Sequence, residues 1–418
     1  MDINFLLYLF NYSYSTSYKR NRLSKIFYYV FQFKCYLKLL INHFVIVCVN
    51  KKKARYLSLS FFMIGATLLL SGCTFKDIDK RAFVTSIGID QSENPGKKYK
   101  VMIKVAIPNG DPKRPKSEFL ILTANTDSIS EGLNLMKSQI DKELVYGHSS
   151  TIVIGEKLAK SNIQPLLEFF VRRPDIQMTS YLSVGKPNAY EVLNFKPIQE
   201  QVSGGVLKSY FDFSRTESPY IDQVCLFDAY RRETEDGIDI VMPIIESNKK
   251  DLLVDRIALF DKSKMIMELS PSESETYRLI TTGIYDESLK VKNKKVMYVM
   301  NLEKGKANYK LKHQNKNIVA NYTIKVRAVI EEKIDGLDPI KESDISELNK
   351  QLEDKINAET KALLSKIKEK DIDPIGFGLR YLSRNSENRN LSLWNKKYTN
   401  LAFKIKSEVK IKGTGLVN

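Results

Sequence analysis

The sequence predicts an α+β fold with three mixed α/β domains, the last an antiparallel sheet covered by one long helix. Stretches in which apolar and polar residues alternate, as in half-buried strands, occur on both sides of a helical middle region. Near the end of the chain, one apolar stripe from Ile345 to Ile367 repeats every three or four residues, which predicts a long helix with one dry face. The chain after Cys73 is long enough for two or three hydrophobic cores.

Composition and periodicity divide the chain into successive segments. They are a leader over 1–50, a lipoprotein signal peptide over 51–72, an N-terminal α/β domain over 73–196, a small middle domain over 197–250 and a C-terminal sheet-plus-long-helix domain over 251–418.

The expected elements of the N-terminal domain alternate between strands and helices. A turn containing Asn94-Pro95-Gly96 joins the first two strands into an antiparallel pair. In order, we expect strands over 81–90, 99–107 and 118–123, a helix opened by Asp127-Ser128, a strand over 150–154, a helix over 163–171, a strand over 179–184 and a helix over 187–193.

The middle segment has helical patterns over 200–211 and 222–232, and the C-terminal segment is rich in strand patterns. There we expect strands over 252–260, 296–302, 309–312 and 318–331, a helix from Ser343-Asp344 to Asp371, and a closing strand over 401–411. Glu347 is placed for a capping box at the start of that helix. A helix with one apolar stripe that follows a one-faced sheet covers that sheet most economically.

The residues before Cys73 have the order of a lipoprotein signal. Lys51-Lys52-Lys53 and Arg55 are basic, residues 57–70 are apolar, and Leu70, Ser71 and Gly72 form the expected cleavage site before Cys73. Cys73 is therefore the predicted lipidation site, which would tie the following domains to a membrane. The alternative is a buried core helix or short membrane anchor, with Cys73 as a buried thiol.

The first fifty residues do not resemble the rest of the chain. They crowd Asn, Tyr, Ser, Phe and Lys together and contain one acidic residue, Asp2. We expect this segment to be a mis-annotated leader, with initiation near Val47 or Val49 through a non-AUG codon. The alternative is a membrane segment over 39–49, which is short for a span and carries His43.

Charge and cysteine content argue against a nucleic-acid-binding protein and against a fold stabilised by disulfides. Ten basic residues and Asp2 precede Cys73, so the net charge of +17 falls to +8 after it. This is compatible with anionic lipid or acidic wall polymer, although a solvated lysine-rich surface is the simpler interpretation. We expect no nucleic-acid partner, because no basic helix face is interleaved with aromatic residues. With Cys73 acylated, Cys225 has no partner, so no disulfide framework is expected.

No catalytic or metal motif is present in the sequence. It has three histidines and lacks an HExxH motif, paired CxxC motifs and a G-x-S-x-G elbow. We therefore expect a protein that is not an enzyme and has no metal and no cofactor. Arg172 and Arg173 are the candidate partner surface, and the alternative for them is solvated charge at a helix end.

Four stretches, taken in order, resemble the Ger(x)C family of spore germination lipoproteins, the C subunits of germinant receptors. They are Leu70–Cys73 followed by Val84–Asp90, then Gly147–Ala159, Leu167–Asp175, and Asp373–Gly378 with Trp394 downstream. The chain departs from the family pattern after the cysteine, where Thr74-Phe75 replaces Trp-Asp, and at Arg172-Arg173-Pro174, where the family tends to have Arg-Asp-Pro.

The resemblance implies a fold of three mixed α/β domains and a non-enzymatic role. It implies a subunit on the outer face of the inner spore membrane that acts with the membrane A and B subunits to trigger germination. Two alternatives remain open: a solute-binding lipoprotein, which predicts two similar lobes around a cleft, and a cell-wall-acting enzyme.

Overall fold

The computed structural model describes Tyr56, residues 58–65 and most of 77–412. The gaps in the latter range are 108–117, 197–204, 212–222, 249, 284–286, 294–295, 315–316, 335–339 and 385–389. The chain divides into two compact units, Met1–Lys76 and Asp77–Asn418. The predicted leader, the cleavage residues Leu70, Ser71 and Gly72, and Cys73 lie outside the described residues.

Part of the predicted signal segment is described in the first unit. Residues 58–65 are helical, and large apolar side chains such as Leu59 and Phe62 are exposed. No helix among the described residues is both long enough and apolar enough to cross a membrane.

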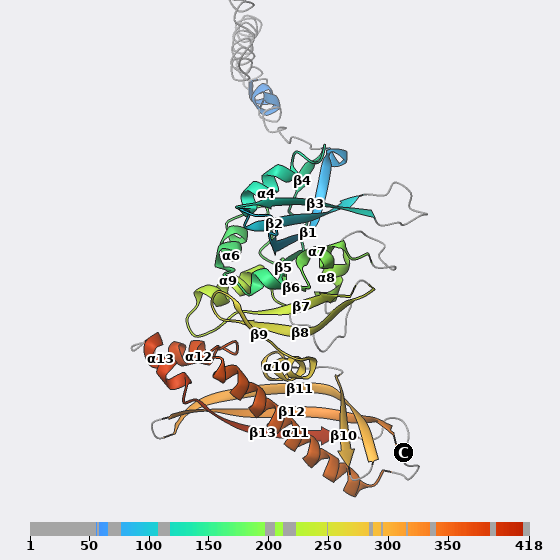
Figure 1. The fold of residues 1–418 in the computed structure, drawn as a ribbon, viewed down its shortest axis with the longest axis vertical. Coiled ribbons are helices and arrows are strands. Elements are labelled where there is room, and N and C mark those ends of the chain that lie inside the picture. The colour runs from blue at the N-terminus through green and yellow to red at the C-terminus, as the bar shows by residue number, and fades with distance from the viewer. Residues whose placement is uncertain are drawn as a thin grey trace, which may run out of the picture. The chain divides into compact units, whose positions relative to one another are not determined.

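The second unit contains two sheets, which confirms the α+β class (Figure 1). The first sheet has the order β3-β2-β1-β5-β6-β7-β8-β9, with β4 beside β1. Its strands are β1 (Arg81–Gln91), β2 (Tyr99–Ile107), β3 (Glu118–Thr126), β4 (Glu143–Val145), β5 (Thr151–Gly155), β6 (Tyr181–Lys186), β7 (Val241–Ser247), β8 (Leu252–Phe260) and β9 (Met265–Glu268).

The centre of this sheet is parallel and has helices on both faces. β1, β5, β6 and β7 pair in parallel, and all five residues of β5 are buried, as expected for a strand covered on both sides. The short 3-10 turn η1 (Ile78–Lys80) precedes β1. One face packs α4 (Ile129–Met136), α5 (Glu156–Ala159), α6 (Gln164–Val171) and α9 (Leu226–Thr234), and the other packs α7 (Ala189–Asn194) and α8 (Gly205–Phe211).

The second sheet has the order β10-β11-β12-β13, and α11 (Glu342–Glu369) packs against it (Figure 1). Its strands are β10 (Glu287–Asn293), β11 (Val296–Gln314), β12 (Asn317–Lys333) and β13 (Ala402–Ile411). The helix α10 (Pro271–Thr281) contacts β8, β11 and α11, and α12 (Phe377–Arg384) and α13 (Leu391–Tyr398) precede β13. The long helix expected from the apolar stripe is thus present.

Three details differ from expectation. β13 pairs parallel to β12 instead of antiparallel, because the crossover through α11, α12 and α13 returns the chain in the same direction. β11 is one strand where two were expected. A register irregularity between Asn301 and Lys304 lets the hydrogen-bonded ladder continue through residues 303–308, which separate the two expected strands. The helix α11 begins at Glu342, and its capping box joins Lys341 to Asp344 instead of using Glu347.

The segment expected as a small middle domain is built into the first sheet. Its helices α8 and α9 lie on opposite faces of that sheet, and its strand β7 pairs with β6 and β8. The sheet therefore runs across both expected boundaries, at 196 and at 250. The three-domain division of the chain remains a proposal.

Candidate functional site

The two arginines of the predicted partner surface lie at the end of α6 in different environments. Arg172 has a 76% exposed side chain and pairs with Glu168 one helical turn earlier, at 2.5 Å. Arg173 donates two hydrogen bonds to Asp175, one of them Nε to Oδ1 at 2.8 Å, and these bonds lower the pKa of that carboxyl group. Its guanidinium also lies 5.1 Å from the ring centre of Tyr146. Arg173 is therefore held in place, whereas Arg172 is solvated.

A hollow of about 470 Å³ lies beside Arg173, lined by residues 143–147 and 174–177. Tyr146 lines it, is buried, and has a hydroxyl group without a hydrogen-bond partner among the described residues. Burial raises the pKa of Tyr146 to about 12. The neighbouring His148, on an exposed turn, packs edge-on against Phe83. The role of Arg172 and Arg173 as a partner surface remains a prediction.

Two of the motifs that carry the family resemblance meet at a buried carboxylate. Asp90, at the end of Val84–Asp90, accepts hydrogen bonds from the backbone N–H of Ala189 at 2.7 Å and of Tyr190 at 3.1 Å. These bonds satisfy the first turn of α7. A Cβ at Gly155, in the second motif, would lie 1.9 Å from the Asp90 carboxylate, so only glycine fits there. Both motifs have a structural role at this point.

A buried polar cluster surrounds Asp373, in the fourth of the stretches that carry the family resemblance. Its carboxylate accepts three backbone N–H bonds, from Gly376 at 2.9 Å, Phe377 at 3.0 Å and Gly378 at 2.7 Å. The turn into α12 is thereby closed around one side chain. Its own backbone pairs with Asp239 in the loop before β7, since Asp373 N–H donates to Asp239 Oδ2 at 2.5 Å and Asp239 N–H donates to Asp373 O at 3.0 Å.

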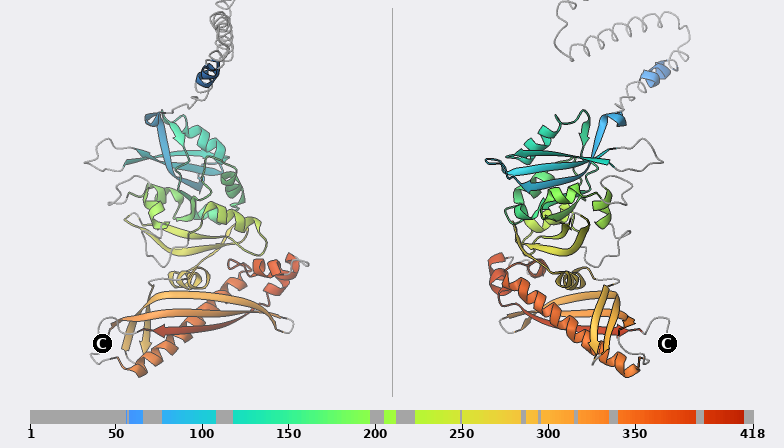
Figure 2. Two further views of the ribbon diagram at one scale, coloured as in Figure 1. Left: turned by 180° about the vertical axis from the view of Figure 1, so that it is seen from behind. Right: turned by 45° about the vertical axis from the view of Figure 1, so that its right-hand side comes forward.

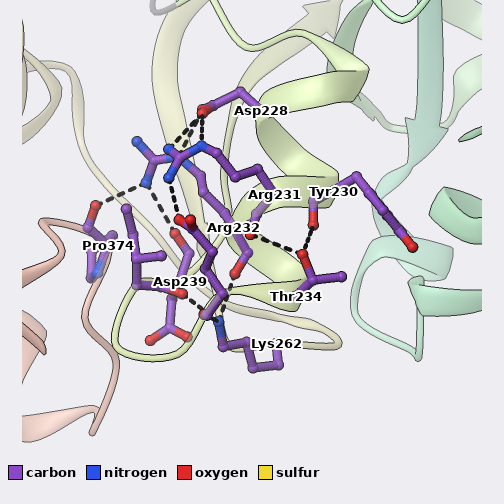
Figure 3. A network of polar contacts seen from close by, with 10 residues as sticks. Asp228, Tyr230, Arg231, Arg232, Thr234, Asp239, Lys262 and Pro374 are labelled. Carbon is purple, nitrogen blue, oxygen red and sulfur yellow. Dashed lines mark hydrogen bonds and ion pairs between the residues drawn. The ribbon is translucent and has the colours of Figure 1, made fainter. Parts of the chain in front are cut away.

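Two cations brace the loop that carries Asp239 (Figure 3). Arg232 donates to the carbonyl oxygens of Asp239 at 3.1 Å and of Pro374 at 3.0 Å, and its Nε bonds Asp228 at 2.7 Å. The Lys262 ammonium donates to three backbone carbonyls, those of Arg232, Glu235 and Ile238. One side chain thus ties the end of α9 to the segment before α12, 142 residues further along the chain.

Glycines allow the two backbones to touch. Gly237 has φ +76°, and a Cβ there would lie 2.4 Å from the carbonyl carbon of Gly378. A Cβ on Gly378 would lie 2.4 Å from Trp394 Nε1. The N–H of Leu379 donates to the Gly237 carbonyl at 2.7 Å, so the contact is also a hydrogen bond. Residues 237–239 and 373–379 form what we call the junction, which joins the first sheet to the C-terminal helices.

Burial dominates the electrostatics of the junction. It raises the pKa of Asp373 to about 7 and raises the pKa of Asp239, while it lowers the pKa of Lys262. Among the described residues, no group of three or more His, Cys, Asp or Glu side chains is placed to hold a metal ion. The bonds of the junction all serve to hold backbone, which makes it a structural site.

We expect the contribution of Asp373 to the stability of the protein to fall as the pH rises from about 4 to about 7. The folded pKa of Asp373 is about 7, whereas an unfolded aspartate titrates near 3.9, so the folded chain holds a proton in this interval that the unfolded chain has lost. The contribution is about 2–4 kcal/mol, full below the lower value and lost above the higher one. Urea unfolding of the wild type and of Asp373→Asn at pH 5 and pH 7.5 measures it. An equal pH dependence in the two proteins would contradict the assignment to Asp373.

The junction was only partly visible in the sequence. Asp373–Gly378 was singled out as a motif, and the structure assigns it to packing. Asp239, Gly237, Arg232 and Lys262 were missed, because each lies in polar sequence without a motif. The remaining signal was Asp236-Gly237, a dipeptide typical of turns.

Comparison with known proteins identifies the family. The model described as "Spore germination protein N-terminal domain" matches residues 75–247, and that described as "Spore germination B3/GerAC like, C-terminal" matches residues 255–415. The chain belongs to the GerAC family of spore germination proteins. The junction thus joins the two matched regions of this family, since Asp239 lies in the first and Asp373 in the second.

Individual relatives cover nearly the same length. The chain is 25% identical to the spore germination protein GerQC of Bacillus cereus over 373 residues, which are 88% of this chain and 99% of the relative. It is 23% identical to the spore germination protein B3 of Bacillus subtilis (strain 168), over 82% of this chain and 92% of the relative. The crystal structure of the GerBC protein has a similar fold, with a TM-score of 0.54 and 17% identity over 79% of this chain and 98% of that one.

Proposed function

We propose that the chain is the lipid-anchored C subunit of a nutrient-germinant receptor, which acts with membrane A and B subunits on the outer face of the inner spore membrane to trigger germination. The observation that carries the proposal is membership of the GerAC family across both of its regions. The order of basic residues, apolar stretch and Cys73 supports the lipid anchor, and the first family match begins two residues after that cysteine.

A non-enzymatic role agrees with the chemistry of the described residues. The buried Asp90 accepts two backbone N–H bonds and the buried Asp373 accepts three, so each carboxyl group holds a turn of the backbone in place. Cys225 is half-buried, and burial raises the pKa of its thiol, which disfavours the nucleophilic thiolate. These environments favour a structural role for the two carboxyl groups and for Cys225.

Replacing Cys73 with alanine is expected to remove the acyl chains, release the protein from the membrane and depress germination. The acyl chains hold the protein because each buried methylene contributes about 0.8 kcal/mol to membrane binding. Incorporation of labelled fatty acid, membrane fractionation and germination of mutant spores measure the three effects. Cys225→Ala is the matched control, and it should keep label, membrane attachment and germination. Full germination of the Cys73→Ala spores would show that the anchor is dispensable for function.

The solute-binding alternative is tested separately. It predicts tight, stoichiometric binding of an amino acid or sugar, which calorimetry of the purified protein would detect. The two sheets of the described fold differ in size and strand order, whereas that alternative calls for two similar lobes.

A further inference from the structure

The second sheet has one face covered and one face exposed. The covered face contributes Tyr322, Ile324 and Val326 to the core, and α11 runs along it (Figure 2). Residues that alternate with these on β12 are exposed, as are their partners on β11 and β13. We call this exposed surface of β10 to β13 the basic face, because lysines dominate it.

The strand registers place like charges directly opposite one another. Lys304 on β11 lies opposite Arg327 on β12, which lies opposite Lys410 on β13. In the next row, Lys306 lies opposite Lys325, whose ammonium also pairs with Glu408 on β13 at 3.4 Å. The basic residues of the face are Lys290, Lys292, Lys304, Lys306, Lys310, Lys312, Lys325, Arg327, Lys404, Lys406 and Lys410. Like charges in directly opposed positions destabilise a sheet, so this arrangement has a cost that an anionic partner would relieve.

The positive charge is concentrated on this face. The exposed acidic residues among or directly beside the eleven basic ones are Glu303, Glu331, Glu332 and Glu408. The excess of basic over acidic residues on the face is about as large as the net charge of +8 of the whole sequence after Cys73. The rest of that sequence is therefore close to neutral, which a lysine-rich composition spread evenly over the surface would not produce.

Protection of a sheet edge does not account for these lysines. Lysines on an exposed edge strand commonly prevent pairing with other chains. Here α11 already covers the edge strand β13, since the N–H groups of Val409 and Ile411 donate to Glu353 at 2.9 Å and Asn349 at 3.1 Å. The basic rows also continue onto β11 and β12, which are interior strands.

We propose that the basic face docks on the surface of a bilayer with anionic headgroups. The proposal rests on the proposed function only in placing the chain beside a membrane. All but one of the basic residues are lysines, whose compact charges suit a diffuse anionic surface better than the bidentate recognition typical of arginine. The described positions of the face carry no aromatic side chain on which a nucleic-acid base would stack. A basic face together with an acyl chain provides two membrane-binding signals.

Lysine labelling of the full chain in vesicles tests the proposal. An amine-reactive acylating reagent, followed by mass spectrometry, measures the reaction rate at each lysine in phosphatidylglycerol and in phosphatidylcholine vesicles. Lys306, Lys325 and Lys406 are expected to react at least threefold more slowly in the phosphatidylglycerol vesicles. Lys157 and Lys361, which are exposed elsewhere, should react equally in both. At 1 M salt, where the Debye length is about 3 Å, the protection should disappear.

A matched pair of triple variants separates position from total charge. The first variant combines Lys306→Glu, Lys325→Glu and Lys406→Glu. In this variant the remaining lysines of the face should be labelled at equal rates in the two kinds of vesicle. The control variant combines Lys157→Glu, Lys350→Glu and Lys361→Glu, which makes the same change in net charge at exposed positions away from the face. It should keep the slower labelling of the face in phosphatidylglycerol vesicles. Flotation of the vesicles measures attachment through the Cys73 anchor, and lysine labelling measures docking of the basic face. Each proposal can therefore be contradicted without the other.

Two results would overturn the proposal. One is equal labelling of the face in the two kinds of vesicle. The other is protection that appears with the membrane proteins of the spore but not in protein-free vesicles, which would assign the face to an acidic protein.

Discussion

Replacing Asp373 with alanine is expected to lower the free energy of unfolding by about 3–5 kcal/mol, because three buried N–H groups would lose their acceptor together. Each buried donor left without a partner costs about 1–3 kcal/mol, and the tight packing around Phe377 leaves little room for water to substitute. Denaturant unfolding of the purified protein near pH 6 measures the loss.

Asp354→Ala is the control for this change. Asp354 lies exposed on α11, so its replacement should alter stability by no more than about 0.5 kcal/mol. If the two alanine variants were equally stable, the three bonds to Asp373 would not support the turn into α12.

Replacing Gly237 with alanine is expected to cost about 2–5 kcal/mol, from two separate causes. The left-handed backbone at φ +76° costs an alanine about 1–2 kcal/mol. The added Cβ would also lie 2.4 Å from backbone of Gly378, which forces the two loops apart at a further cost of about 1–3 kcal/mol.

Gly96 provides a control with the same backbone conformation. It also has φ +76°, but a Cβ there would meet nothing within 4 Å. Gly96→Ala should therefore cost only the backbone term, about 1–2 kcal/mol. The difference between the two variants in thermal or urea unfolding measures the close approach at the junction, and equal losses would show that the approach is not constrained.

These two predictions concern the same structural feature. Asp373 closes the turn before α12, and Gly237 admits that turn against the loop before β7. Because the loop belongs to the first sheet and the turn to the C-terminal region, loosening either partner should also loosen the packing of the two regions of the GerAC family on each other.

Local patterns were sufficient for the elements with strong periodicity. The alternation over 81–90 and 99–107 predicted β1 and β2, and the stripe from Ile345 to Ile367 predicted α11. β7 was missed because Val241–Ser247 is almost entirely apolar and contains Pro243, so it has no alternation to detect. α10 and α13 were missed because each is short, and their amphipathic patterns cover only two or three turns.

The sequence by itself determined the α+β class, the family and the strongly periodic elements, and it predicted the lipid anchor, because each of these depends on residues close together in the chain. Only the tertiary structure decided that β7 completes the first sheet, that β13 runs parallel to β12, and that Asp239 and Gly237 meet Asp373 and Gly378. It also gathered lysines from four strands onto one face. The physical reason is the same in each case: strand pairing, the satisfaction of buried backbone groups and the sum of surface charges depend on residues that are distant in sequence and adjacent in space.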